Sequence, residues 1–76
     1  MADTLTAESA ITYARNLMAS YGSGNDIIAV HSVTANEDST DDTPALDVAF
    51  TYQGGGDHVG VMVVWLDPDG RLYGEF

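Results

Sequence analysis

Apolar residues near the start of the chain recur every three or four positions, which is the rhythm of one face of an α-helix. The residues that share this face are Ala7, Ala10, Ile11, Ala14, Leu17, Met18 and Tyr21. Thr6 is suited to cap the first turn, because its hydroxyl can accept a hydrogen bond from a free backbone N–H. Gly22 and Gly24 then end the pattern. We therefore predict a helix over residues 6–21.

Beyond the helix, apolar runs alternate with turn signals, which is typical of strands joined by short connections. Residues 26–35 are rich in β-branched types, and residues 45–53 alternate between apolar and polar side chains. Residues 58–66 are apolar at both sets of alternate positions, and residues 71–76 follow an Asp-Pro-Asp-Gly turn. We predict a strand over each range. Sequential strands with short links pair antiparallel.

The helix and the strands each have an apolar face to bury, and packing one against the other buries both. We therefore predict an α+β fold, α-β-β-β-β, in which one N-terminal helix is packed on a four-stranded antiparallel sheet as two layers. The whole of residues 1–76 is predicted to be a single domain. The sheet face toward the helix is predicted to contain Leu46, Val48, Phe50, Val59, Val61, Val63 and Trp65. The opposite face would present Ala49, Met62, Val64 and Leu66.

Charge is the most unusual property of the composition. Twelve acidic residues stand against only two basic ones, Arg15 and Arg71, and the formal net charge is −10 at pH 7. Such a surface repels nucleic acid and anionic membranes and attracts basic protein surfaces. We therefore expect no direct nucleic-acid partner and no membrane partner. A salt-adapted or merely solubilising coat of acids is the alternative explanation.

The residues that usually carry catalysis are scarce in this chain. It has no cysteine and no lysine, and His31 and His58 do not form a zinc-binding spacing such as HExxH. The acids of residues 37–42 lack the spacing and the glycine of a calcium-binding loop. No lysine or helix follows the glycines of residues 54–56, which predict a hairpin turn and not a phosphate loop. We expect a non-enzymatic protein with no cofactor and no metal.

The sequence also bears on location. No apolar run is long enough to span a membrane, and residues 1–4 lack the basic and apolar segments of a signal peptide. We therefore expect a cytoplasmic protein, in the host cytoplasm if it is phage-encoded.

The acids suggest an inhibitor that mimics nucleic acid and occupies the basic site of a nucleic-acid-binding protein. The candidate contact residues are Glu37, Asp38, Asp41, Asp42, Asp47 and Asp57. Asp67 and Asp69 could join Asp57 in a second patch at the hairpin tips. Attraction of this kind is long-ranged and weakens with salt.

The alternative is an interaction module, such as an immunity or protease-inhibitor-type protein, that works through an apolar outer sheet face. The possible dimer face consists of Met62, Val64 and Leu66. A second apolar patch on so small a domain is typical of a homodimer or of a partner-binding surface.

Two segments carry a resemblance to a known family. The helix opens with Thr6-Ala7-Glu8-Ser9-Ala10-Ile11, and the later strands contain Val64-Trp65-Leu66-Asp67-Pro68-Asp69-Gly70-Arg71-Leu72. On these segments, residues 6–76 resemble a PepSY domain, which implies a non-enzymatic domain linked to the inhibition of proteases. In size and acidity the chain is also similar to small phage-encoded inhibitors, such as anti-CRISPR and anti-restriction proteins. These share no motif, so this similarity implies inhibition but assigns no site residue.

Overall fold

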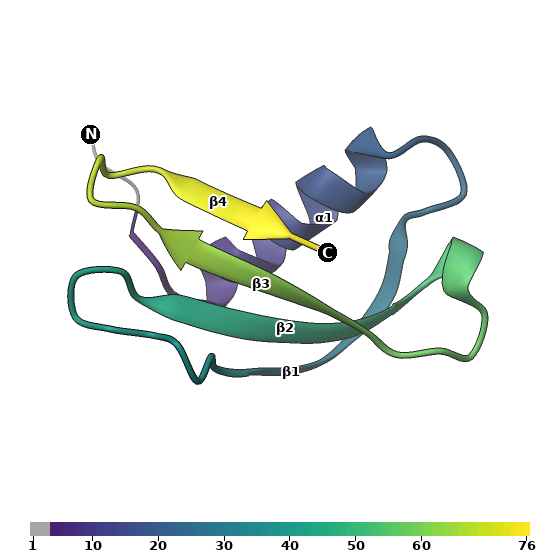
Figure 1. The fold of residues 1–76 in the computed structure, drawn as a ribbon. Helices are drawn as coiled ribbons and strands as arrows, with labels where there is room; N and C mark the ends of the chain where they lie inside the picture. Colours follow the sequence, from purple (N-terminus) through teal and green to yellow (C-terminus); the bar gives the residue numbers. More distant parts are fainter. Residues whose placement is uncertain (1–3) are drawn as a thin grey trace.

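One helix and four strands follow each other along residues 4–76, the part of the chain that the computed structural model describes. They are α1 (Ala7–Ser20), β1 (Ile27–Ala35), β2 (Ala45–Tyr52), β3 (Gly60–Leu66) and β4 (Leu72–Glu75). The strands form one antiparallel sheet in the order β1-β2-β3-β4. Helix α1 crosses one face of this sheet (Figure 1). The predicted α+β fold, with an N-terminal helix on a four-stranded sheet, is confirmed.

The start of α1 is fixed by a reciprocal pair of hydrogen bonds. The backbone N–H of Ser9 donates to Oγ1 of Thr6 over 3.1 Å, and the backbone N–H of Thr6 donates to Oγ of Ser9 over 2.8 Å. This capping box satisfies backbone donors that the helix itself leaves without a partner. Thr6 is therefore the N-cap, as predicted. Tyr21 caps the other end, so the predicted range 6–21 includes both caps.

The core lies between α1 and the inner face of the sheet. Small residues at Ala10 and Ala14 allow the helix to approach the strands closely. Glycine does the same on β4, where a Cβ atom added to Gly74 would lie 2.6 Å from Cε1 of Tyr13. The buried core residues are Ala10, Ala14, Met18, Ile27, Val48, Phe50, Met62 and Val64.

The orientation of β3 is opposite to the one predicted. Met62 and Val64 have no exposed surface and pack in the core under α1, so the prediction that they form an outer dimer face is wrong. The physical reason is the strand register. Met62 lies directly opposite Val48, and opposite residues of an antiparallel pair share a face of the sheet. Leu66 shares the alternation of Met62 and Val64 and is only partly buried.

The alternate residues of β3 consequently point away from the helix. Val61 is 51% exposed, and Val63 and Trp65 lie on the same side of the strand. Val59, which was also expected in the core, is exposed in the connection that precedes β3.

The β2–β3 and β3–β4 hairpins differ in their connections. Between β3 and β4, the backbone N–H of Gly70 donates to the carbonyl of Asp67 over 2.9 Å, and Gly70 has a φ of 84°. This is the predicted tight turn, with glycine where φ is positive. The β2–β3 connection is longer than the predicted glycine turn, because it contains a 3₁₀ turn over Gln53–Gly55 before β3 begins.

Strand β1 forms one edge of the sheet, and its pairing with β2 is interrupted twice. The register shifts fall between Ile27 and Ala29 and between Val30 and Ser32. Irregularities of this kind bend a strand and increase its twist. Ile27 nevertheless remains buried, with Val30 and Val33 packed against the core.

Candidate functional site

The sheet face away from α1, here called the outer face, is covered by no helix of residues 4–76 (Figure 1). Its apolar centre runs along β3 and is continued on the neighbouring strands. The residues of this centre are Ala49, Val61, Val63, Trp65 and Tyr73. Val63 lies opposite Asp47 on β2 and opposite Glu75 on β4. Two carboxylates therefore flank the apolar centre in one row across three strands.

A shallow hollow of about 330 Å³ lies at this face. Val63 and Trp65 line it on β3, while Asp38 of the β1–β2 loop and Glu75 of β4 supply its carboxylates. The other lining residues are Asn36, Thr43 and Ala45. The hollow therefore combines an apolar and aromatic lining with negative charge from two distant segments of the chain.

The β1–β2 loop is held against the sheet by its own polar side chains. Asn36 Nδ2 donates to Oδ1 of Asp47 over 2.7 Å, and the backbone N–H of Ala45 donates to Oγ of Ser39 over 2.9 Å. The backbone N–H of Asp38 donates to Oδ1 of Asn36 over 2.8 Å. These local bonds give the backbone of the loop partners other than a neighbouring strand, and they place Asp38 beside the outer face.

The β3–β4 turn supplies two more carboxylates to the same face. The indole Nε1 of Trp65 donates to Oδ1 of Asp67, and the hydroxyl of Tyr73 donates to Oδ2 of Asp69, both over 3.0 Å. The hydrogen bond to Asp69 and the nearby negative charge raise the pKa of Tyr73 above its ordinary value, because both disfavour the phenolate. Each aromatic ring thus has a carboxylate at its polar edge.

The carboxylates that border the outer face come from three segments of the chain, and we call them the acidic rim. They are Asp38, Asp47, Asp67, Asp69 and Glu75. Within residues 4–76 no carboxylate forms an ion pair with either arginine, Arg15 or Arg71. Arg71 lies close enough to Tyr73 to act on its pKa, in the lowering direction, but it is the one arginine beside five carboxylates. The rim therefore keeps a net negative charge.

The six acids expected as contact residues do not form one patch. Asp38 and Asp47 belong to the acidic rim, and Glu37, Asp41 and Asp42 are exposed on the same loop as Asp38. Asp57 lies in the β2–β3 connection, at the opposite end of the sheet.

Sequence reasoning missed the aromatic pair Trp65–Tyr73 and the acid Glu75. It also placed Asp67 and Asp69 with Asp57, whereas the register puts these two turn acids beside Trp65 and Tyr73.

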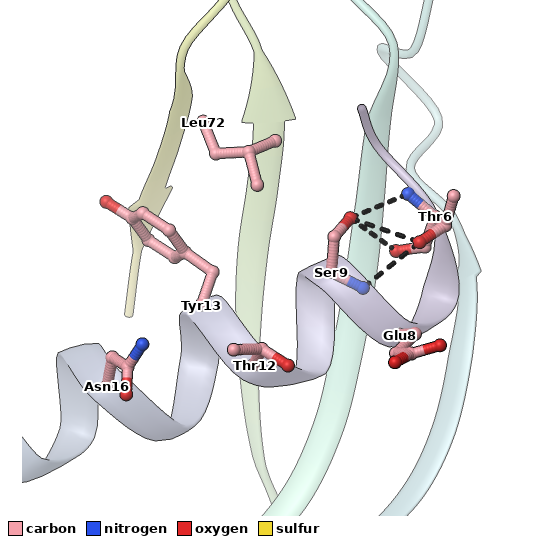
Figure 2. Close-up of a pocket in the computed structure, with 7 residues that line it drawn as sticks. All are labelled: Thr6, Glu8, Ser9, Thr12, Tyr13, Asn16 and Leu72. Atoms are coloured by element: carbon pink, nitrogen blue, oxygen red, sulfur yellow. Dashed lines mark hydrogen bonds between the residues drawn. The ribbon is translucent and has the colours of Figure 1, made fainter. Parts of the chain in front are cut away.

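A second hollow, of about 460 Å³, lies between α1 and β4 (Figure 2). Its helix wall is mostly hydroxyl and amide groups, and Tyr13 reaches from the helix toward Leu72 on β4. The hydroxyls of Thr6 and Ser9 are used in the capping box, so local helix chemistry explains them. Among residues 4–76, Glu8 is the one acid in its lining. The outer face, with its apolar centre and acidic rim, is therefore the stronger candidate site.

The remaining chemistry-bearing residues do not converge in the described part of the chain. His31 on β1 and His58 before β3 are both exposed, and neither bonds to a carboxylate of residues 4–76. No group of three or more metal-binding side chains is found in that range. Helix α1 is too short and too polar to cross a membrane.

Comparison of the chain with models of known families, with curated proteins and with solved structures finds no match. The resemblances to PepSY domains and to phage-encoded inhibitors stay predictions.

Proposed function

We propose that this protein is a non-enzymatic binding protein that docks its outer face onto a basic site of a protein partner. The observation that carries the proposal is the convergence of the acidic rim. Carboxylates from the β1–β2 loop, from β2 and from the β3–β4 hairpin border the one sheet face that α1 leaves uncovered. An apolar centre inside a polar rim is the usual anatomy of a protein–protein interface.

The charge of the outer face favours a basic partner over a second copy of this chain. A symmetric dimer through this face would bring two acidic rims together, and like charges at an interface are costly. A surface rich in arginine or lysine would instead gain from the same carboxylates. Glu37, Asp41 and Asp42 on the β1–β2 loop extend the negative potential and would speed the encounter with such a partner.

Proteins that bind a phosphate backbone present a lysine- and arginine-rich surface to it. We therefore propose that the partner is a nucleic-acid-binding protein, and that docking of the outer face inhibits it by occupying its basic site. No direct contact of this protein with nucleic acid is needed, since its carboxylates replace the phosphates.

A capture experiment with two charge-matched variants tests the proposal. The rim variant carries Asp38→Asn, Asp47→Asn and Glu75→Gln. The control variant carries Glu8→Gln, Asp26→Asn and Asp57→Asn, which removes the same amount of charge away from the outer face. Each immobilised protein is exposed to nuclease-treated cell extract at low and at raised salt. Captured proteins are then assayed for nucleic-acid binding with and without the unmodified protein.

The rim variant is expected to retain about tenfold less partner than the unmodified protein, and the control variant about as much as the unmodified protein. The captured partner is expected to lose nucleic-acid binding when the unmodified protein is added. Equal capture by both variants would show that the acids act as an undifferentiated coat. If the captured partner binds nucleic acid equally well with and without the unmodified protein, the inhibitory function is contradicted but the docking proposal is not.

A further inference from the structure

Trp65 and Tyr73 lie directly opposite each other on β3 and β4 and form an aromatic pair on the outer face. Their ring centroids are 6.0 Å apart, and their planes are inclined by 21°, which is a stacked arrangement. The other aromatic contacts of residues 4–76 join Phe50, Tyr52 and Phe76 and do not include this pair. Because it is separate from the core, the pair is free to serve recognition.

Hydrogen bonds hold both rings by their polar edges. Asp67 accepts from the indole of Trp65, and Asp69 accepts from the hydroxyl of Tyr73. Asp69 also accepts from the backbone N–H of Arg71 through its other oxygen, over 3.0 Å. The second oxygen of Asp67 accepts no hydrogen bond from residues 4–76 and remains available. The rings are thus fixed in place with negative charge at their edges.

This combination of flat π-faces and adjacent carboxylates matches the chemistry of a guanidinium group. A guanidinium stacks flat on an aromatic ring and still directs its N–H groups outward to carboxylates. The hollow of about 330 Å³ that Trp65 lines has Asp38 and Glu75 at its border. Its size is at the low end of the range for small-molecule pockets, which suits one long side chain.

We propose that the aromatic pair Trp65–Tyr73 and the adjoining hollow receive an arginine side chain of the partner. This inference rests on the proposed function, because it names the recognition element of a partner that docks on the outer face. Arginine is favoured over lysine, since an ammonium is a compact and strongly hydrated charge that gains less from a flat ring. The acidic rim supplies the charge complementarity, and the pair supplies the selectivity.

Trp65 is the only tryptophan of the chain, so its fluorescence reports directly on the pair. The test is a fluorescence titration with two peptides of equal charge, nona-arginine and nona-lysine. Nona-arginine is expected to change the emission of Trp65 and to bind about fivefold more tightly than nona-lysine. Tyr73→Leu keeps the reporter and is expected to abolish this preference, whereas the distant control Asp57→Asn is expected to keep it.

A second variant covers the case in which Tyr73→Leu does not fold. Asp67→Asn preserves the shape of the side chain but removes the charge at the ring edge, and it is expected to reduce the preference for arginine. Equal affinity for the two peptides, or an unchanged preference in both variants, would overturn the arginine site.

The outcomes separate this inference from the proposed function. If the rim variant loses the captured partner while the two peptides bind equally, only the arginine site is wrong. If the rim variant and its control capture equal amounts of partner while nona-arginine is still preferred, the docking proposal is wrong and the pair is a local arginine-binding site.

Discussion

On β3, Met62 and Val64 face the helix and are fully buried, whereas Val61, Val63 and Trp65 face away from it. Both sides of the strand are apolar, so hydrophobicity alone does not decide which side is buried. The neighbours differ instead. The inner side meets the alanines and Met18 of α1, while the outer side is flanked by Asp47 and Glu75. A carboxylate tolerates an exposed face and is costly to bury, so the flanking strands set the orientation of β3.

The two faces of the sheet therefore have different roles. The inner face provides stability, because its side chains lose their contact with water on folding. The outer face contributes less to folding and retains the apolar area and the charge that an interaction with another molecule needs.

Shortening a side chain on the two sides of β3 is expected to have very different effects. Met62→Ala leaves a cavity under α1 and is expected to lower the free energy of unfolding by about 2–5 kcal/mol. The change Val61→Ala on the outer face is expected to cost less than about 0.5 kcal/mol. Urea denaturation followed by circular dichroism measures both. Similar losses for the two variants would contradict the division between the faces.

Adding a methyl group where the helix meets β4 is expected to have a smaller effect. Gly74→Ala brings a Cβ atom to 2.6 Å from Cε1 of Tyr13, so the helix or the ring must move. We expect a loss of about 1–3 kcal/mol from this overpacking. The loss is expected to shrink in a Tyr13→Ala background, which a double-mutant cycle measures. An equal loss in both backgrounds would show that the strain does not come from Tyr13.

The N-cap at Thr6 stabilises α1, the helix that covers the inner face of the sheet. Thr6→Ala removes the acceptor for the N–H of Ser9 and is expected to lower the free energy of unfolding by about 1 kcal/mol. Thr12→Ala is the control, because the exposed hydroxyl of Thr12 makes no hydrogen bond within residues 4–76. Partner capture by the folded Thr6→Ala protein is expected to be unchanged. Reduced capture would mean that the outer face depends on the helix.

The smallest effect is expected from the titration of Tyr73. Its pKa is raised above 10.0 by the hydrogen bond to Asp69, so the neutral hydroxyl is the form that folding favours. The resulting stabilisation is fully present below the unfolded-state pKa and is lost as the pH rises through the folded-state pKa. Asp69→Asn is expected to lower the pKa of Tyr73. Tyrosinate absorbance, with Tyr73→Phe to identify the signal, measures it, and an unchanged pKa would exclude Asp69 as the cause.

The sequence predicted the element order and all five elements to within a few residues, because periodicity and turn residues are local signals. The sequence did not determine which side of β3 faces the helix, because residues 58–66 have apolar side chains on both sides of the strand. The last strand contained the missing signal. Arg71 and Glu75 alternate with Leu72 and favour solvent, and the Asp-Pro-Asp-Gly turn brings Trp65 opposite Tyr73. Trp65 therefore had to share the outer face with these polar residues.

The candidate site was predicted less completely than the fold. Asp47 could be placed on the outer face from the alternation of residues 45–53 alone. Asp38 could not, because its position depends on hydrogen bonds that Asn36 and Ser39 make within an irregular loop. No periodic pattern encodes such bonds. The convergence of the acidic rim is thus a property of the tertiary structure.

The two edges of the sheet have a consequence for how other molecules meet this protein. Strand β1 is nine residues long, but its two register shifts interrupt the row of backbone groups along the strand. Strand β4, at the other edge, has only four residues. A strand of another molecule finds no long, regular row of backbone groups to pair with at either edge. Edge-to-edge aggregation is therefore disfavoured. Contact is thereby directed to side chains and away from the main chain.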